Sequence, residues 1–320
     1  MNTSPTTQER IWAVFSHLSA LAFGMGLLLP IIGWSEQRRK SKYASFQCLQ
    51  ALGYQSLGYT VWILSYLVVI IVLIVIFIVA LSTARGARGT GDAIAGIWMA
   101  SFFVTIFGLL ALYFLMPVIA AIACAFGVDF RYPVLGKRLA RYLGHQPENA
   151  DETLIEEHEE RWIAAMGHFS IIIALWGILA PVTAWIIQGK HSLFLRFQSI
   201  QTTAYQAFVN IIYMGTGLLY FVAVMMFFAM TGLGAGSANT SPTSMPALFI
   251  FGVLTLFASI IFLIVPLFHI LGQWAGYRVL KGDNYHYPVI GKLTEKWVAT
   301  KTPVVGDGDL SIEALEGKPS

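Results

Sequence analysis

The chain has 320 residues, of which 57% are hydrophobic and only 12% are charged. Soluble domains carry about 25% charged residues, so this composition cannot cover a water-exposed surface and predicts an integral membrane protein. The formal net charge of +3 comes from cations beside the apolar runs. That distribution suits the headgroups of a lipid bilayer and excludes nucleic acid as a partner.

The first apolar segment follows a polar leader, residues 1–8. Thr6 and Glu9 have the spacing of a capping box, which predicts that a helix starts just before Arg10. The apolar run over residues 11–34 is longer than a signal-peptide core and long enough to cross a bilayer. We therefore expect it to remain in the protein as the first span.

A polar stripe marks the entry to the second helix, residues 43–55. Gln47, Gln50 and Tyr54 follow one another at helical spacing, so they share one helix face. The stripe either lines a hydrated path or packs in a seam between helices, and we favour the seam.

Two longer apolar runs come next, residues 57–81 and 93–126, separated by a glycine-rich loop at residues 82–92. They are predicted to be the second and third spans. A straight helix over the third run would be about 50 Å long, against a hydrocarbon core of about 30 Å. The third span must therefore tilt, kink at Pro117 or leave the membrane early.

A Tyr-Pro pair closes this part of the chain. After Tyr132 and Pro133, a short helix is predicted with apolar residues on one side and basic residues on the other. A helix of this kind suits the membrane surface. Tyrosine is typical of that depth, so Tyr132 and Pro133 are predicted to anchor the chain among the headgroups. Tyr287 and Pro288 are predicted to do the same.

The sequence pattern described so far occurs twice in the chain. An offset of 151 residues aligns the first half with the second, and past the middle of each half the offset becomes 155. The aligned pairs include His17 with His168, Pro30 with Pro181, Trp34 with Trp185, Gln47 with Gln198, Gln50 with Gln201, Tyr54 with Tyr205, Tyr132 with Tyr287 and Pro133 with Pro288. The chain is therefore predicted to be a tandem duplication.

The duplicated residues also carry a resemblance. The sequence His17, Leu18, Ser19, then a short basic loop, a Phe/Gln helix entry and a closing Tyr-Pro, resembles a bacterial multi-span membrane domain family of unknown function. That family is distantly similar to the Tic-twenty channel subunit of the chloroplast inner-envelope translocon. The resemblance implies a bundle of membrane helices and a role related to translocation, without supplying a substrate.

Three spans in each copy would invert the second copy relative to the first. The basic turn at residues 38–42 would then face the cytoplasm and residues 190–196 the opposite side. Cations favour the cytoplasm, and the second copy would violate this rule. We favour a 3+3 inverted arrangement nonetheless. The alternative is a hidden fourth crossing in each copy, which would place all basic segments inside.

His17 and His168 lie within apolar helices, where an ionisable group is costly. Neither has a second metal-ligating residue one helical turn away, so the sequence favours a neutral imidazole hydrogen-bonded to a neighbouring Gln over a metal site. A proton-linked role is the third possibility.

Signals for catalysis are weak. The segment HEERW at residues 158–162 lacks the second histidine of a zinc protease, and GDGDL at residues 306–310 lies in a polar tail. Cys48 and Cys124 have no metal-binding or disulfide spacing. We predict no enzyme activity, no catalytic or metal-binding residue and no cofactor.

The sequence therefore predicts an all-α integral membrane protein with two homologous three-helix units, six spans in total, and interfacial amphipathic helices. The predicted boundaries are residues 1–8 for the leader, 9–145 for the first repeat, 146–159 for an acidic linker, 160–300 for the second repeat and 301–320 for a flexible tail. The expected location is a prokaryotic cytoplasmic membrane.

For the function we expect a non-enzymatic accessory or pore-like component in translocation. Two alternatives stay open. One is a transporter of ions or small molecules at the interface of the repeats. The other is a membrane scaffold that binds other membrane proteins.

Overall fold

The computed structural model describes residues 4–83, 90–145, 153–231 and 244–301, and within these ranges the chain is helical without a strand. Most of the predicted loop at 82–92, the first half of the acidic linker and nearly all of the tail lie outside the described residues. The chain divides into two compact units, residues 1–199 and 200–320. Among the described residues, five segments are long and apolar enough to cross a membrane, namely Thr7–Gln37, Lys42–Ser82, Ala93–Ala125, Leu193–Ala229 and Leu248–Leu280.

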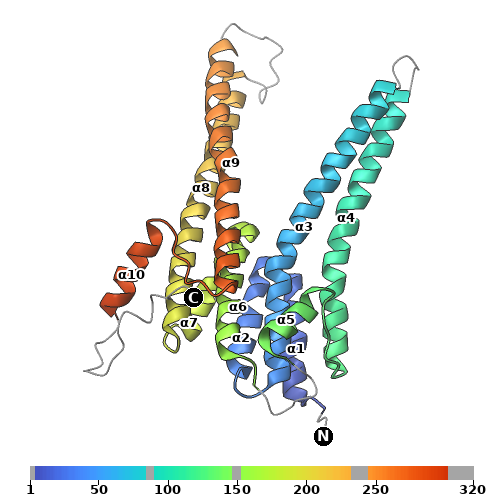
Figure 1. Ribbon diagram of the computed structural model, residues 1–320. Coiled ribbons are helices and arrows are strands. Elements are labelled where there is room, and N and C mark those ends of the chain that lie inside the picture. The colour runs from blue at the N-terminus through green and yellow to red at the C-terminus, as the bar shows by residue number, and fades with distance from the viewer. Residues whose placement is uncertain (1–3, 84–89, 146–152, 232–243, 302–320) are drawn as a thin grey trace. The chain divides into compact units, whose positions relative to one another are not determined.

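The first of these segments is a helical hairpin, not one straight helix (Figure 1). Helices α1 (Thr7–Leu18) and α2 (Leu28–Gln37) are joined by η1 (Ser19–Leu27), where the backbone breaks at Phe23 with φ 51° and ψ −140°. A Cβ atom on Gly33 would lie 3.0 Å from the Trp12 ring, although a straight helix would separate these residues by about 30 Å. The predicted first span over residues 11–34 is therefore bent back on itself instead of running as one helix.

The start of α1 is as predicted. Thr6 and Glu9 form the capping box, in which each side chain bonds the backbone or side chain of the other. This box satisfies backbone N–H groups that have no partner inside the helix.

The second repeat folds in the same way. Helices α6 (Glu156–Phe169) and α7 (Leu179–Gln188) are joined by η2 (Ser170–Trp176), where the backbone breaks at Ala174 with φ 48° and ψ −130°. Ala174 is the residue that the 151-residue offset aligns with Phe23. The duplication therefore extends to the backbone conformation of the break.

The two hairpins of unit 1 lie side by side and point the same way. At one end, which we call the base, Arg38 Nη1 after α2 donates to Gln188 Oε1 of α7 over 3.2 Å. At the other end, the tips, a Cβ atom on Gly24 would lie 2.1 Å from Trp176 Cβ. The residues at 38–42 and the end of α7 thus share one end of unit 1, so the structure gives no support to the expected placement of 38–42 and 190–196 on opposite sides. The inverted arrangement is not confirmed.

Helices α3 (Lys42–Thr83) and α4 (Thr90–Ala125) are much longer than the hairpins (Figure 1). The predicted amphipathic entry and second span form one continuous helix, and α4 continues through Pro117. The two helices pair along their length, since Tyr54 Oη donates to Tyr113 O over 2.7 Å and Trp98 Nε1 donates to Leu73 O over 2.9 Å. Beyond the hairpin tips their outward faces consist of exposed aliphatic and aromatic side chains.

The short helix α5 (Leu135–Leu143) is amphipathic, as predicted, but it faces the protein. Leu139 and Leu143 are buried, whereas Lys137, Arg138 and Arg141 are exposed. Helix α5 packs on α3 and α6. The expectation that its apolar side enters the membrane surface is therefore wrong.

In unit 2, α8 (Leu193–Thr231), which begins in unit 1, pairs with α9 (Ser244–Leu280), and α10 (Ile290–Lys301) follows. Polar contacts connect α8 and α9: Tyr220 Oη lies 2.6 Å from Ser259 Oγ, and Tyr213 Oη lies 2.9 Å from His269 Nε2. His269 of α9 is thus hydrogen-bonded to α8 across the helix pair.

Candidate functional site

The centre of the first repeat is a buried histidine, His17 of α1, which is 0% exposed. Its Nε2 lies 3.0 Å from Gln47 Oε1 and its Nδ1 lies 3.0 Å from Tyr132 Oη. The amide oxygen can only accept, so Nε2 carries the proton and Nδ1 accepts from the tyrosine hydroxyl. A neutral imidazole satisfies both contacts, and the structure thereby places His17 against the glutamine that the sequence suggested.

The polar stripe of α3 binds the segment that follows α4. Gln47 Nε2 donates to Asp129 Oδ1 over 2.8 Å and to Phe130 O over 3.0 Å. Gln50 Nε2 also donates to Phe130 O, over 2.9 Å, and Gln50 Oε1 accepts from the backbone N–H of Tyr132 over 3.1 Å. Both glutamines therefore supply the hydrogen bonds of a backbone stretch that belongs to no helix.

Tyr132 is the other half of this arrangement. It is 2% exposed, and its ring stacks on that of Tyr54 with centroids 4.2 Å apart. Burial raises the pKa of Tyr132 well above its ordinary value, so the hydroxyl remains a donor to His17. The expectation that Tyr132 anchors the chain at headgroup depth is wrong, because its ring lies in the protein interior; Pro133 beside it is exposed.

A tight turn follows Pro133 and was not foreseen. Val134 has φ 64° and ψ −58°, and Leu135 N donates to Pro133 O over 2.7 Å, which is a γ-turn with a positive φ. Val289 has φ 67°, and Ile290 N donates to Pro288 O over 2.8 Å in the second repeat. The Tyr-Pro motif is thus duplicated because it places one buried tyrosine and one sharp turn in each copy.

Asp129 closes the cluster on the side of the base. Its carboxylate lies 3.1 Å from Arg131 Nη2 and 3.2 Å from His145 Nε2, and His145 stacks on Phe46 with centroids 4.0 Å apart. Burial acts to raise the pKa of Asp129, but the hydrogen bond and electrostatic interaction with His145 and the charge of Arg131 outweigh it and lower the pKa. The carboxylate is therefore ionised and fixed.

The second repeat has equivalent hydrogen bonds and ring contacts, some within unit 1 and others within unit 2. In unit 1, His168 Nε2 lies 3.1 Å from Gln198 Oε1. In unit 2, Gln201 Nε2 donates to Tyr285 O over 2.7 Å and Gln201 Oε1 accepts from Tyr287 N over 3.2 Å. The rings of Tyr205 and Tyr287 stack with centroids 4.0 Å apart. Tyr287 is buried, so its predicted anchoring role is also wrong, and Pro288 is exposed.

A second cluster, at the base, joins the two repeats. Arg38, whose side chain is 7% exposed, lies 2.8 Å from Glu156, 3.1 Å from Glu160 and 4.0 Å from Glu159. Its guanidinium also covers the Trp34 ring at 4.6 Å from the centroid. One cation of the first repeat thus faces three carboxylates of α6, a contact that sequence reasoning missed because its partners are more than 100 residues apart.

Glu159 is the most buried of these carboxylates, at 2% exposed. Burial raises its pKa from 4.5 to about 7, and the neighbouring charge of Arg38 only partly offsets this. A folded-state pKa above the unfolded value means that the folded protein holds the proton more tightly between these two pH values. The folded state therefore loses stability as the pH rises from about 4.5 to about 7.

Glu159→Gln removes the titratable carboxyl group, so the stability of the folded protein should depend less on pH. Between about pH 5 and about pH 8, the stability of the variant relative to the parent should increase by roughly 2–3 kcal/mol. Thermal unfolding of the purified proteins at both pH values measures this. Glu157→Gln, at a side chain that is 70% exposed, is the matched control and should show no such change. A variant that follows the parent at both pH values would contradict the assignment.

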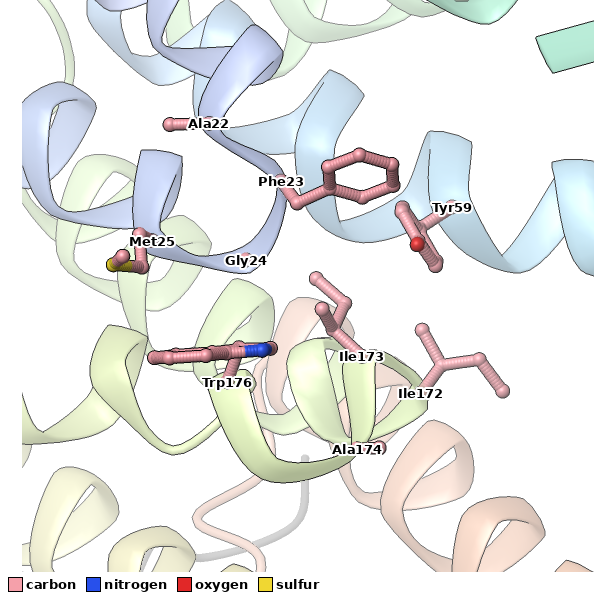
Figure 2. Close-up of a pocket in the computed structure, with 9 residues that line it drawn as sticks. All are labelled: Ala22, Phe23, Gly24, Met25, Tyr59, Ile172, Ile173, Ala174 and Trp176. Atoms are coloured by element: carbon pink, nitrogen blue, oxygen red, sulfur yellow. The ribbon is translucent and has the colours of Figure 1, made fainter.

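The tips of the two hairpins enclose an open apolar pocket of about 410 Å³ (Figure 2). Its wall is formed mainly by Phe23, Met25, Tyr59, Ile173 and Trp176. No charged side chain lines it. Within the ranges that the structure describes, no group of three or more His, Cys, Asp or Glu residues is arranged to hold a metal ion.

The structure is that of a tandem-repeat helical membrane protein. It has long apolar helices with exposed aliphatic faces, two hairpins with a buried His–Gln pair each, and a Tyr-Pro turn in each copy. The family model of the magnetosome magnetite crystal formation protein family matches the chain twice, over residues 8–139 and 159–294. These matches cover more than half of the chain, which therefore belongs to this bacterial membrane protein family. They do not show the similarity to the Tic-twenty subunit. No curated protein and no solved structure matches the chain.

Proposed function

We propose that this chain is a non-catalytic structural component of the membrane in which a magnetite crystal forms. The family description names crystal formation in a magnetosome and no enzymatic reaction. The single observation that carries the structural role is the closed polar cluster of the first repeat. His17, Gln47 and Gln50 are engaged with one another and with the backbone at residues 130–132, so they hold helices together instead of lining a water-filled path.

The hairpins also support a topology for the proposal. If α1–α2 and α6–α7 each enter and leave on the base side, the chain crosses the bilayer four times, through α3, α4, α8 and α9. An even number of crossings in each repeat leaves the basic segments of both repeats on the same side. The conflict with the positive-inside rule then disappears, because residues 38–42 and residues 278–296 all face the cytoplasm.

Two measurements test the proposal: one tests the link to crystal formation, and the other distinguishes a structural role from transport. Removing the gene from a magnetite-forming cell should change the number or size of crystals seen by electron microscopy, and the full chain should restore them. Purified chain in sealed vesicles should conduct ferrous iron and protons no faster than vesicles without protein.

Saturable iron or proton flux through the reconstituted chain would overturn the structural role in favour of a transporter or pore. Unchanged crystals in the deletion strain would overturn the link to crystal formation. The two failures are separate, since the first concerns the closed cluster and the second concerns the biological setting.

A further inference from the structure

Unit 1 differs in cross-section between its base and its far end. Helices α1, α2, α6 and α7 have 10 to 14 residues each, about 15–21 Å at 1.5 Å per residue, whereas α3 and α4 have 42 and 36 residues. The hairpin tips reach only to Tyr59 of α3 and Phe114 of α4. Beyond that level, the described part of unit 1 consists of α3 and α4 alone.

The surface of the hairpins is suited to lipid. Phe15 on α1 is 54% exposed, Phe23 at the first tip is 46% exposed, and Trp176 at the second tip is 49% exposed. Side chains of this kind belong in hydrocarbon or at its boundary, because water would have to cover them otherwise. The tips therefore lie within the bilayer.

The base has the opposite character. The side chains of Arg39 and Lys40 are 81% and 66% exposed, and the basic side chains of α5 are exposed as well. Cations of this kind lie at the headgroups and favour the cytoplasmic leaflet. If the level of the tips marks the middle of the bilayer, the half-length helices occupy only the leaflet on the base side.

We propose that the chain binds preferentially to strongly curved bilayer in which the leaflet on the base side is convex. Each half-length helix is about 10 Å across and displaces lipid from that leaflet only, while α3 and α4 displace lipid from both. The protein is therefore wider in the base-side leaflet than in the other leaflet. This shape fills the extra space between headgroups in a convex leaflet and so relieves its strain. With the base in the cytoplasm, the convex leaflet is the outer surface of a small vesicle inside the cell. This inference does not depend on the role in crystal formation.

The experiment compares orientation in vesicles of two sizes. Full-length Lys40→Cys protein is reconstituted into small sonicated and large extruded vesicles of the same phosphatidylcholine and phosphatidylglycerol mixture, and labelled with a membrane-impermeant maleimide. Cys48 and Cys124 are buried, so labelling reports position 40. The ratio of molecules with the base facing outward to molecules with the base facing inward should be several-fold higher in the small vesicles than in the large ones.

Ser82→Cys, near the far end of α3, should give the mirror-image ratio and serves as the matched control. Equal ratios in both vesicle sizes, or a base that turns inward in small vesicles, would overturn the proposal. Vesicles of phosphatidylcholine alone separate shape from charge: the size dependence should persist there, and its loss would show that headgroup charge orients the protein.

Discussion

Replacing His17 by leucine should lower the free energy of unfolding by on the order of 2–4 kcal/mol. The imidazole is fully buried and bonds Gln47 on one side and Tyr132 on the other. Leucine fills similar space but leaves an amide oxygen and a phenol hydroxyl without this partner in a place that water does not reach. Chemical or thermal unfolding in detergent micelles measures the loss.

Two further variants make this result interpretable. His191→Leu changes an exposed histidine of the same unit and should alter stability by less than about 0.5 kcal/mol. Tyr132→Phe removes only the hydroxyl and should cost about 1 kcal/mol, which keeps the test open if the leucine variant cannot be purified. A His17→Leu protein that unfolds like the parent would show that the cluster does not hold the helices together.

Gly24→Ala should separate the two hairpin tips. The added Cβ would lie 2.1 Å from Trp176 Cβ and 2.9 Å from Ile173 Cγ2. Because the nearer atom is attached directly to the backbone, rotation of a side chain cannot relieve the clash and the hairpins must move apart. Overpacking of this kind costs about 1–3 kcal/mol, which thermal unfolding in detergent micelles measures.

Gly108→Ala is the matched control for this substitution. Gly108 lies on α4, where a Cβ atom would meet nothing within 4 Å. Alanine favours a helix over glycine by up to about 1 kcal/mol, so this variant should be as stable as the parent or slightly more so. If both glycine variants behave alike, the hairpin tips do not pack as described.

Much of the fold follows from local chemistry that the sequence displays. The capping box at Thr6 and Glu9, the helical spacing of Gln47 and Gln50, and the duplication at a fixed offset each depend on residues a few positions apart or on self-similarity. The pairing of His17 with a glutamine followed from the cost of a lone polar group in hydrocarbon. The structure has the contact.

The hairpins were missed because a run of apolar residues is compatible both with a span and with two half-length helices. Neither Phe23 nor Ala174, where the backbone breaks, is a residue that usually ends a helix. A signal was present nonetheless: Gly26 and Pro30 of the first repeat align with Gly177 and Pro181 of the second. The charge conflict of a three-span repeat pointed to the same error.

The buried position of Tyr132 and the contact of Arg38 with Glu159 had no such signal. Tyrosine beside proline is compatible with a membrane surface, and only the chain path after α4 brings this ring to His17. The partners of Arg38 lie on α6, more than 100 residues away along the chain. Their proximity depends on how two hairpins pack, which no local pattern encodes.

The central claim, that each repeat enters the membrane as a hairpin and returns to the side from which it came, can be tested by labelling single cysteines in intact cells. Lys40→Cys and Lys190→Cys are both exposed positions, one at the base after each hairpin, and Ser82→Cys marks the far end of α3. The account predicts that a membrane-impermeant maleimide reaches positions 40 and 190 from the same side and position 82 from the other. Labelling of positions 40 and 190 from opposite sides would contradict it and restore the inverted repeat.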